Sequence, residues 1–137
     1  RAVKIELASD LPLVFVDAVL IQQVMLNLLE NAIKYSPAGT AIDIAATSPD
    51  NASVLFSVAD RGPGVSEEHR LRIFDKFYRN STSQTGVGLG LSICSGIIEA
   101  HDGKIWVDTR EGGGSVFKFL LPAQNDLLPD AQLEKTQ

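Results

Sequence analysis

Hydrophobic and polar residues alternate strictly over residues 3–7 (VKIEL). A period of two predicts a β-strand with one buried face. Strand-like stretches follow at 41–46 and 53–59, and the Pro-Asp-Asn turn signal between them predicts a hairpin. Two more strand-like stretches, 104–109 and 115–121, are joined by a connection that contains three consecutive glycines.

Hydrophobic residues recur every three to four positions in two other stretches, which predicts amphipathic helices. The first begins after Asp17, whose carboxylate can cap the first turn, and ends near Tyr35, before a Ser-Pro pair. The second begins at about Leu89 and ends near His101, which we expect to cap it. Gly103 is then expected to be the left-handed residue that stops this helix.

These elements predict an α+β fold, a two-layer sandwich in which helices cover one face of a mainly antiparallel mixed sheet. A short apolar patch at 71–78 predicts one or two further helical turns. We expect the folded domain to span residues 1–122 and the polar stretch 123–137 to be a disordered tail.

Composition narrows the classes of function. The 137 residues, 45% of them hydrophobic, fit one domain with a real core. The formal net charge of -5 argues against a nucleic-acid partner, which requires a basic surface. The single cysteine, Cys94, excludes an intrachain disulfide and fits a reducing compartment. No apolar run approaches the roughly 20 residues of a membrane span. Because the chain does not begin with Met, we expect it to be part of a larger protein.

Three polar residues share one face of the first predicted helix. Asn27, Asn31 and Lys34 fall within roughly 60° of one another at about 100° per residue. Amide oxygens are hard ligands suited to Mg²⁺, and an ammonium group is a point charge for phosphate oxygens. The next residue, Tyr35, can stack on a base or simply pack at the helix end. An ordinary solvated polar face is the alternative interpretation.

An acidic residue and a glycine turn follow the strand-like stretch at 53–59. Asp60 can accept a hydrogen bond from an exocyclic amine such as the N6 amine of adenine, and Gly62 and Gly64 allow a backbone to approach a flat ligand closely. A plain Asp-Gly turn is the alternative.

A third signal is the glycine-rich run 86–91 (GVGLGL), which opens a helix and can bind phosphate at its free N–H groups. It is no P-loop, because no Gly-Lys-Ser/Thr follows it, and its spacing does not match a Rossmann fingerprint. Lys76 and Arg79 precede it and are either phosphate contacts or solvated surface charges.

The two histidines, His69 and His101, lack the neighbours of a metal site or a catalytic triad. Cys94 and the serines have no paired base nearby. The chain is therefore predicted to hold a nucleotide without carrying its own phosphoryl acceptor.

Taken together and in this order, four runs resemble the catalytic, ATP-binding domain of two-component sensor histidine kinases, in the superfamily that includes gyrase B, Hsp90 and MutL. The runs match the family's N box at 27–35 (NLLENAIKY), its first glycine box at 60–64 (DRGPG), its F box at 73–77 (IFDKF) and its second glycine box at 86–91. Within the family, the F box and the run that ends at Cys94 look most like the potassium-responsive Kdp-type kinases.

The resemblance implies a Bergerat-type ATP-binding fold with defined roles for the matched residues. Asn31 would ligate a Mg²⁺ ion that bridges the ATP phosphates, and Asn27 would support it. Lys34 would contact phosphate, and Tyr35 would lie near the adenine or the ribose. Asp60 would bind the adenine N6 amine.

The remaining boxes would complete the site. The resemblance implies that their glycines shape the base pocket and let a loop fold over the triphosphate; these are Gly62, Gly64, Gly86, Gly88 and Gly90. Phe74 and Phe77 would anchor a lid over about 66–85, from which Lys76 and Arg79 could reach phosphate. Further residues of the boxes, and one serine beyond them, are expected at the nucleotide: Ile73, Val87, Leu89, Leu91 and Ser115.

The implied activity is that of a protein histidine kinase: transfer of the γ-phosphoryl group of ATP to a histidine on a separate dimerisation domain, for relay to a response regulator. That acceptor motif is missing from the chain. The parent protein is expected to be a membrane-bound homodimer with this domain in the cytoplasm.

Three alternatives remain open. An ATPase clamp of the gyrase or Hsp90 kind carries a water-activating glutamate four residues before the magnesium asparagine, where this chain has Asn27. A serine kinase that acts on an anti-sigma partner is disfavoured by the long lid with its F box. The last alternative is a nucleotide-binding scaffold without transfer.

Overall fold

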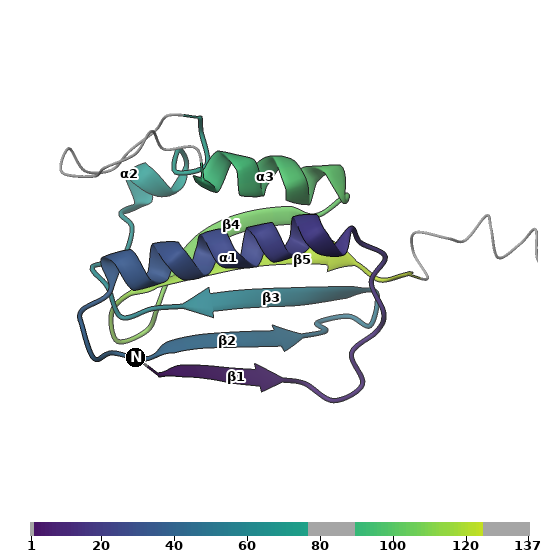
Figure 1. Ribbon diagram of the computed structural model, residues 1–137, viewed down its shortest axis with the longest axis horizontal. Coiled ribbons are helices and arrows are strands. Elements are labelled where there is room, and N and C mark those ends of the chain that lie inside the picture. Colours follow the sequence, from purple (N-terminus) through teal and green to yellow (C-terminus); the bar gives the residue numbers. More distant parts are fainter. Residues whose placement is uncertain (1, 77–89, 125–137) are drawn as a thin grey trace, which may run out of the picture.

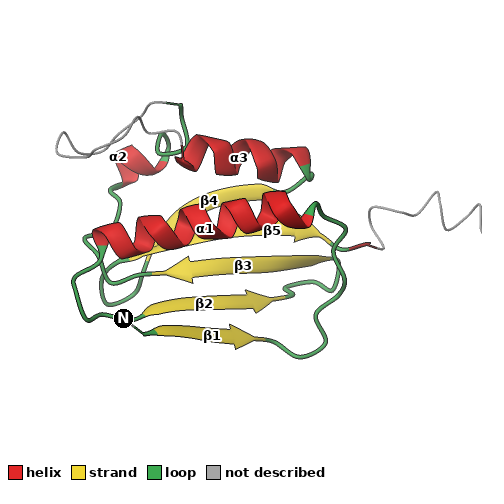
Figure 2. Ribbon diagram, viewed as in Figure 1, coloured by secondary structure: helices red, strands yellow, loops and turns green. Residues whose placement is uncertain are grey.

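The chain forms one sheet with helices on one of its faces (Figure 1; Figure 2). The computed structural model describes residues 2–76 and 90–124. Within these ranges five strands lie in the order β1-β2-β3-β5-β4; they are β1 Val3–Leu7, β2 Ile42–Thr47, β3 Ser53–Ala59, β4 Lys104–Thr109 and β5 Ser115–Pro122. β1 runs parallel to β2, and the other neighbouring pairs are antiparallel. The predicted α+β sandwich and the β2–β3 hairpin are confirmed.

Two long helices, α1 (Ala18–Tyr35) and α3 (Gly90–Ala100), lie side by side over the sheet and enclose the core (Figure 1). The Asp17 carboxylate caps α1 by accepting from the Leu20 N–H at 3.1 Å, as predicted. Buried apolar residues from both layers form the core: Val24, Leu28, Ala32, Ile42, Val58, Ile73, Cys94, Ile98, Val107, Phe117, Phe119 and Leu121. Burial of this apolar surface is the main force that holds the helices on the sheet.

The prediction that β1 buries one face is wrong. Val3, Ile5 and Leu7 are 44%, 66% and 66% exposed. Among the described strands, β1 lies at the edge of the sheet and pairs only with β2, and α1 packs against β3 while α3 packs against β4. Alternation identifies the apolar face of a strand, but the placement of the helices decides whether that face is covered.

The short helix α2 (Glu67–Arg70) lies upstream of the predicted turns at 71–78. Its start is fixed by Ser66, whose hydroxyl accepts from the His69 N–H at 3.3 Å, and the first-turn glutamates suit a helix N-terminus. Residues 71–76 form non-helical turns, and Ile73 anchors them in the core. The position of this short helix is therefore determined by its capping serine and not by the apolar patch.

α3 ends at Ala100, and the left-handed residue that follows it is Asp102, at a φ of 62°, and not Gly103 as predicted. Asp tolerates this conformation better than most residues. Gly103 is needed for a different reason, since a Cβ there would clash with the Leu120 carbonyl oxygen of β5. His101 caps α3 as predicted, with Nδ1 2.8 Å from the Ile97 carbonyl, and its Nε2 accepts from the Asp17 N–H at 3.1 Å.

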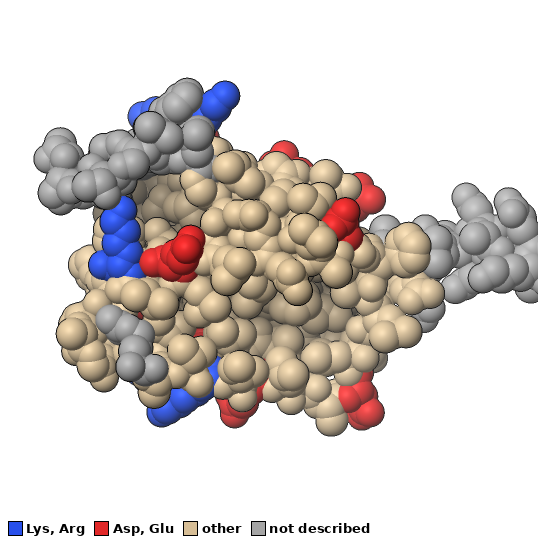
Figure 3. Space-filling view, in the orientation of Figure 1, with Lys and Arg blue, Asp and Glu red and all other residues tan. Residues whose placement is uncertain are grey.

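The folded region continues beyond residue 122, where the domain was predicted to end. Ala123 is buried and pairs with Val14, and the Gln124 N–H donates to the Leu13 carbonyl at 2.6 Å. The rest of the expected tail lies outside the described residues. Among residues 2–76 and 90–124, none of the helices combines the length and apolar character that a membrane crossing requires. The helix side of the molecule faces the viewer in Figure 3, and its central part carries few charged side chains.

Candidate functional site

The asparagine face of α1 meets the beginning of α3. The Asn27 amide donates to the Gly90 carbonyl at 3.3 Å, and its oxygen accepts from the Gln23 amide at 3.3 Å. One turn further on, Asn31 is half-buried, and its side-chain amide makes no hydrogen bond to any residue in the described ranges. The exposed Lys34 ammonium lies 5.4 Å from the centre of the Tyr35 ring. Asn27 therefore joins two helices, while Asn31 and Lys34 keep polar groups available to a ligand.

Asp60 is buried at the end of β3, with 2% of its surface exposed. Its backbone N–H donates to the Ser115 carbonyl at 2.9 Å, which extends the β3–β5 ladder by one residue. The return bond does not go to the Asp60 backbone carbonyl. The Ser115 N–H donates at 3.4 Å to the carboxylate oxygen Oδ1, which also accepts from the Gly62 N–H at 2.8 Å. The other oxygen, Oδ2, has no partner among the described residues and is the atom left for a ligand.

Three glycines pack against Asp60 or against one another beside it. A Cβ at Gly62 would lie 2.7 Å from the Tyr35 carbonyl oxygen and 3.1 Å from Asp60 Oδ1. Gly64, at φ +84°, packs against Gly114, where a Cβ would clash with the Asp60 carbonyl oxygen. The backbone alone therefore shapes the walls beside Asp60, which permits a flat group to approach.

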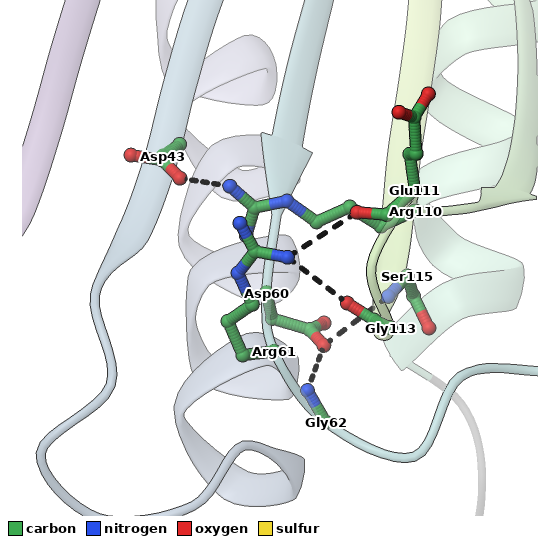
Figure 4. A network of polar contacts seen from close by, with 8 residues as sticks. All are labelled: Asp43, Asp60, Arg61, Gly62, Arg110, Glu111, Gly113 and Ser115. Atoms are coloured by element: carbon green, nitrogen blue, oxygen red, sulfur yellow. Dashed lines mark hydrogen bonds and ion pairs between the residues drawn. The ribbon is translucent and has the colours of Figure 1, made fainter.

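Two arginines hold the turn between β4 and β5, which lies beside Asp60 (Figure 4). Arg61 Nη1 donates to the carbonyls of Glu111 and Gly113 at 3.3 and 3.5 Å. Arg110, at the base of the turn, forms an ion pair with Asp43 of β2. The sequence reasoning missed Arg110, Asp43 and Gly114, which come together only once β3 is known to pair with β5.

The F box is anchored in the core. Ile73 is buried, and the Phe74 ring packs edge-on against Phe117 with centroids 6.1 Å apart. Lys76 is exposed at the end of the first described range. Six expected site residues lie outside the described residues: Phe77, Arg79, Gly86, Val87, Gly88 and Leu89.

The last residues of the second glycine box begin α3. Gly90 is the first residue of this helix, and Leu91 packs partly buried against the core. Ser115, which was expected near the adenine, is buried beside Asp60. The structure therefore brings Ser115 and the acidic residue together, and the place of the adenine stays a prediction.

The chemistry of the remaining candidates is limited. Burial raises the pKa of the Cys94 thiol to about 11, although a hydrogen bond with Asn27 opposes the rise. At neutral pH this thiol is protonated and is a poor nucleophile. In the part of the chain that the structure describes, no three His, Cys, Asp or Glu side chains form a metal cluster. A divalent cation here would have to draw most of its ligands from amides, water and a bound anion.

Comparison with known proteins identifies the family. The family described as "Histidine kinase-, DNA gyrase B-, and HSP90-like ATPase" matches residues 16–125. The chain is 46% identical over 124 residues to the adaptive-response sensory kinase SasA of Nostoc sp. strain PCC 7120, covering 89% of this chain and 31% of that protein. It is 43% identical over 126 residues to the sensor protein KdpD of Clostridium acetobutylicum, covering 89% of this chain and 14% of that protein. The chain thus spans a third or less of these relatives.

Solved structures agree with this result. The catalytic domain of the histidine kinase ThkA superposes with a TM-score of 0.77 at 39% identity, with 89% of this chain and 78% of that chain covered. Full-length ShkA in complex with AMPPNP gives a TM-score of 0.79 at 35% identity, with 89% and 26% covered. This chain therefore belongs to the histidine kinase-, DNA gyrase B- and HSP90-like ATPases and is an ATP-binding catalytic domain of the histidine kinase type.

Proposed function

We propose that this domain binds Mg·ATP and donates the γ-phosphoryl group to a histidine on a separate dimerisation domain of its parent sensor kinase. The observation that carries the proposal is the position of Asn31 along α1. Asn27 contacts the start of α3, and the Tyr35 carbonyl contacts Gly62 beside the buried acid. Asn31 lies midway on a span of about 12 Å. One helix thus joins a candidate base site to a candidate phosphate site.

At the base end, Asp60 Oδ2 accepts the hydrogen bond of the adenine N6 amine. Gly62 and Gly64 leave room for the ring, Ser115 holds the acid in place, and Tyr35 flanks the adenine or ribose. A hydrogen bond to an ionised acceptor is stronger than one between neutral groups. Such a bond favours adenine over bases that present a carbonyl at this position.

At the phosphate end, Asn31 is the protein ligand of Mg²⁺ and Asn27 supports it. The half-buried Asn31 amide, which has no hydrogen-bond partner among residues 2–76 and 90–124, suits an ion that takes one or two protein ligands together with phosphate oxygens and water. When bound, the ion offsets charge on the phosphates. Lys34 contributes a further positive charge. The glycines of the second box, Gly86, Gly88 and Gly90, enclose the triphosphate, together with the adjacent Val87, Leu89 and Leu91.

Phe74 and Phe77, with Ile73, anchor the lid, and Lys76 and Arg79 contact phosphate from it. The packing of Ile73 and Phe74 in the core supports this anchoring. A lid held at this end can close over a bound nucleotide without disturbing the sheet.

The transferred group leaves ADP as the bond to the β-phosphate oxygen breaks and a bond to an imidazole nitrogen forms. Such transfers have loose transition states, so the protein contributes mainly positioning and electrostatic stabilisation. A neutral imidazole nitrogen is already nucleophilic, and the domain needs no strong base. Asn27 cannot accept a proton from water, which favours transfer over hydrolysis.

The wider setting is proposed from the family. The phosphohistidine would pass its group to a response regulator, and the parent would be a membrane-bound homodimer with this domain on the cytoplasmic side. The Kdp type stays our proposal for the subfamily, supported by the 43% identity to KdpD, although the SasA protein of Nostoc matches at a higher identity of 46%. No nucleic-acid partner is proposed.

The test mixes this chain with the parent's histidine-bearing domain and γ-labelled ATP. We expect acid-labile label on the added domain, lost with Asn31→Ala and kept with Gln22→Ala, which removes an exposed amide from another face of α1. Rapid release of phosphate without transfer would favour the ATPase clamp. Nucleotide binding with neither outcome would favour the scaffold, and either result would refute the proposal.

A further inference from the structure

Arg110 and Asp43 form an ion pair that the proposed chemistry does not use. It links the base of the 110–114 turn to β2, across two intervening strands, β5 and β3 (Figure 4). The two side chains are only 16% and 36% exposed. Arg110 also closes the turn through its backbone, since its N–H donates to the Gly114 carbonyl and its carbonyl accepts from the Gly113 N–H.

Stability alone is a poor explanation for this pair. Arg110 Nη1 is buried without a hydrogen-bond partner in the described structure, and an unsatisfied buried donor costs free energy. Ion pairs removed from water generally gain little over apolar replacements of similar size. Their advantage is geometric, because a planar guanidinium group pairs with a carboxylate in only a few relative orientations.

The turn that this pair holds touches Asp60 at two points. The Gly114 backbone packs directly against the Asp60 carbonyl, and the Ser115 N–H donates to Asp60 Oδ1. Arg61 fixes the tip of the same turn through the carbonyls of Glu111 and Gly113. Any movement of the turn therefore changes where the carboxylate points.

We propose that Arg110 and Asp43 are positioning residues for the adenine-binding carboxylate. Their ion pair fixes the 110–114 turn where it leaves β4. The Ser115 N–H can then hold Oδ1, which leaves Oδ2 directed at the adenine. This inference rests on the proposed role of Asp60 in binding adenine. It predicts that two residues with no contact to the nucleotide set the selectivity for the base.

The first test compares binding of ADP and IDP, measured by calorimetry on the 137-residue chain. IDP carries a carbonyl where ADP carries the N6 amine. We expect Asp60→Asn to remove the preference for ADP, which a hydrogen bond to a charged acceptor makes about tenfold or more. Arg110→Met and Asp43→Ala should each lower it about threefold to tenfold, and the double variant no further, because both break one link.

The matched control is the ion pair Lys118–Asp108, at 3.1 Å and 30% and 43% exposed. It lies on the same sheet but joins only the adjacent strands β4 and β5 and does not touch the turn. Lys118→Met should leave the ADP preference unchanged. An equal loss of preference in this control would mean that general loosening of the sheet is the cause, and would overturn the inference.

A second readout needs no nucleotide. Amide hydrogen exchange of Gly62 and Ser115, the two donors to Asp60 Oδ1, should accelerate about tenfold in Arg110→Met, while that of Phe117 and Phe119 in β5 stays the same. Uniform acceleration along β5, or none at Gly62 and Ser115, would contradict the positioning role.

Milder variants cover the case in which Arg110→Met or Asp43→Ala fails to fold. Arg110→Lys keeps the charge but loses the fork, and Asp43→Asn keeps the size but loses the charge. Either should still lower the ADP preference, and an unchanged preference in both would overturn the proposal. If the unaltered chain binds neither nucleotide, the proposed function is wrong, and the exchange rates still decide the positioning role.

Discussion

A methyl group added at Gly114 should disrupt the acid site, whereas the same change at its neighbour Gly113 should not. Both glycines have positive φ, +112° and +107°, so a side chain at either position strains the backbone alike. The surroundings differ. A Cβ at Gly113 meets no atom within 4 Å, whereas a Cβ at Gly114 would clash with the Asp60 carbonyl oxygen. The pair of variants therefore separates backbone strain from contact with Asp60.

The magnitudes follow from this geometry. Backbone strain of this kind costs about 1–3 kcal/mol, offset by somewhat under 1 kcal/mol because alanine restricts the unfolded chain. Gly113→Ala should therefore lower the free energy of unfolding by about 1–2 kcal/mol. Gly114→Ala must also displace Asp60 and give up its two hydrogen bonds with Ser115, at roughly 1 kcal/mol each, for a total near 4 kcal/mol.

Urea and thermal unfolding measure both variants. At about 4 °C per kcal/mol for a domain of this size, we expect midpoints lowered by about 6 °C for Gly113→Ala and about 15 °C for Gly114→Ala. Below these midpoints, Gly114→Ala should bind ADP at least about tenfold more weakly, because its acid is displaced, and Gly113→Ala should bind normally. Equal stability and equal ADP affinity of the two variants would refute the role assigned to the Gly114–Asp60 contact.

Other predictions test the core and the phosphate end. Gly103→Ala should lower the free energy of unfolding in urea by more than about 3 kcal/mol, because the added Cβ clashes with β5. Gly96→Ala, whose Cβ meets nothing within 4 Å, should raise it by about 0.5–1 kcal/mol, because alanine favours the helix α3. Equal effects of the two changes would contradict the packing. Cys94 should react with iodoacetamide at pH 8 about a thousandfold more slowly than a fully ionised thiol, since its pKa is about 11; alkylation at the rate of the unfolded chain would disprove its burial. Above pH 9 the unfolded chain releases this thiol proton and the folded chain keeps it, so the free energy of unfolding should fall by about 2–3 kcal/mol between pH 9 and pH 11. In a Cys94→Ala chain this contribution to the fall should be absent. Asn31→Ala should abolish Mg·ATP binding in calorimetry, and unchanged affinity would remove its assignment as a ligand.

Local signals in the sequence were sufficient for most elements. The β2–β3 hairpin follows from two strand-like stretches around a turn in which Asn51 takes a left-handed φ of 61°. The start of α1 follows from a capping Asp17. In each case the residues that determine the structure are neighbours in the chain, so their pattern carries the information.

The errors came from contacts between distant segments. The exposure of β1 depends on helices that settle elsewhere on the sheet. At the end of α3, Gly103 looks like a left-handed stop, but its place is fixed by the approach of Leu120, while Asp102 takes the strained conformation. A glycine in sequence does not reveal whether it is needed for its dihedral angles or for its lack of a side chain.

The same limit applies to the candidate site. Asp60, Gly62 and Gly64 lie within five residues of one another, and their pattern was visible in the sequence. Arg110 and Gly114 approach from about 50 residues away, and their relevance depends on the pairing of Ala59 with Val116. Given that register, the residue after Ala59 must lie opposite Ser115, and the three preceding glycines must form the turn beside it.

The Asp60 carboxylate owes its position to the sheet itself. Where a regular antiparallel pair would exchange two backbone hydrogen bonds, the Ser115 N–H donates instead to Oδ1 of the side chain. The carboxylate is thus the last member of the β3–β5 ladder, and the hydrogen bonds from Ser115 and Gly62 set its position. A slip of this pairing by one residue would replace Ser115 with a glycine or a valine and turn the acid to the other face. Recognition of the adenine therefore depends on the register of the two central strands, β3 and β5. A variant that alters this register should lose adenine binding before it loses the helices that cover the sheet.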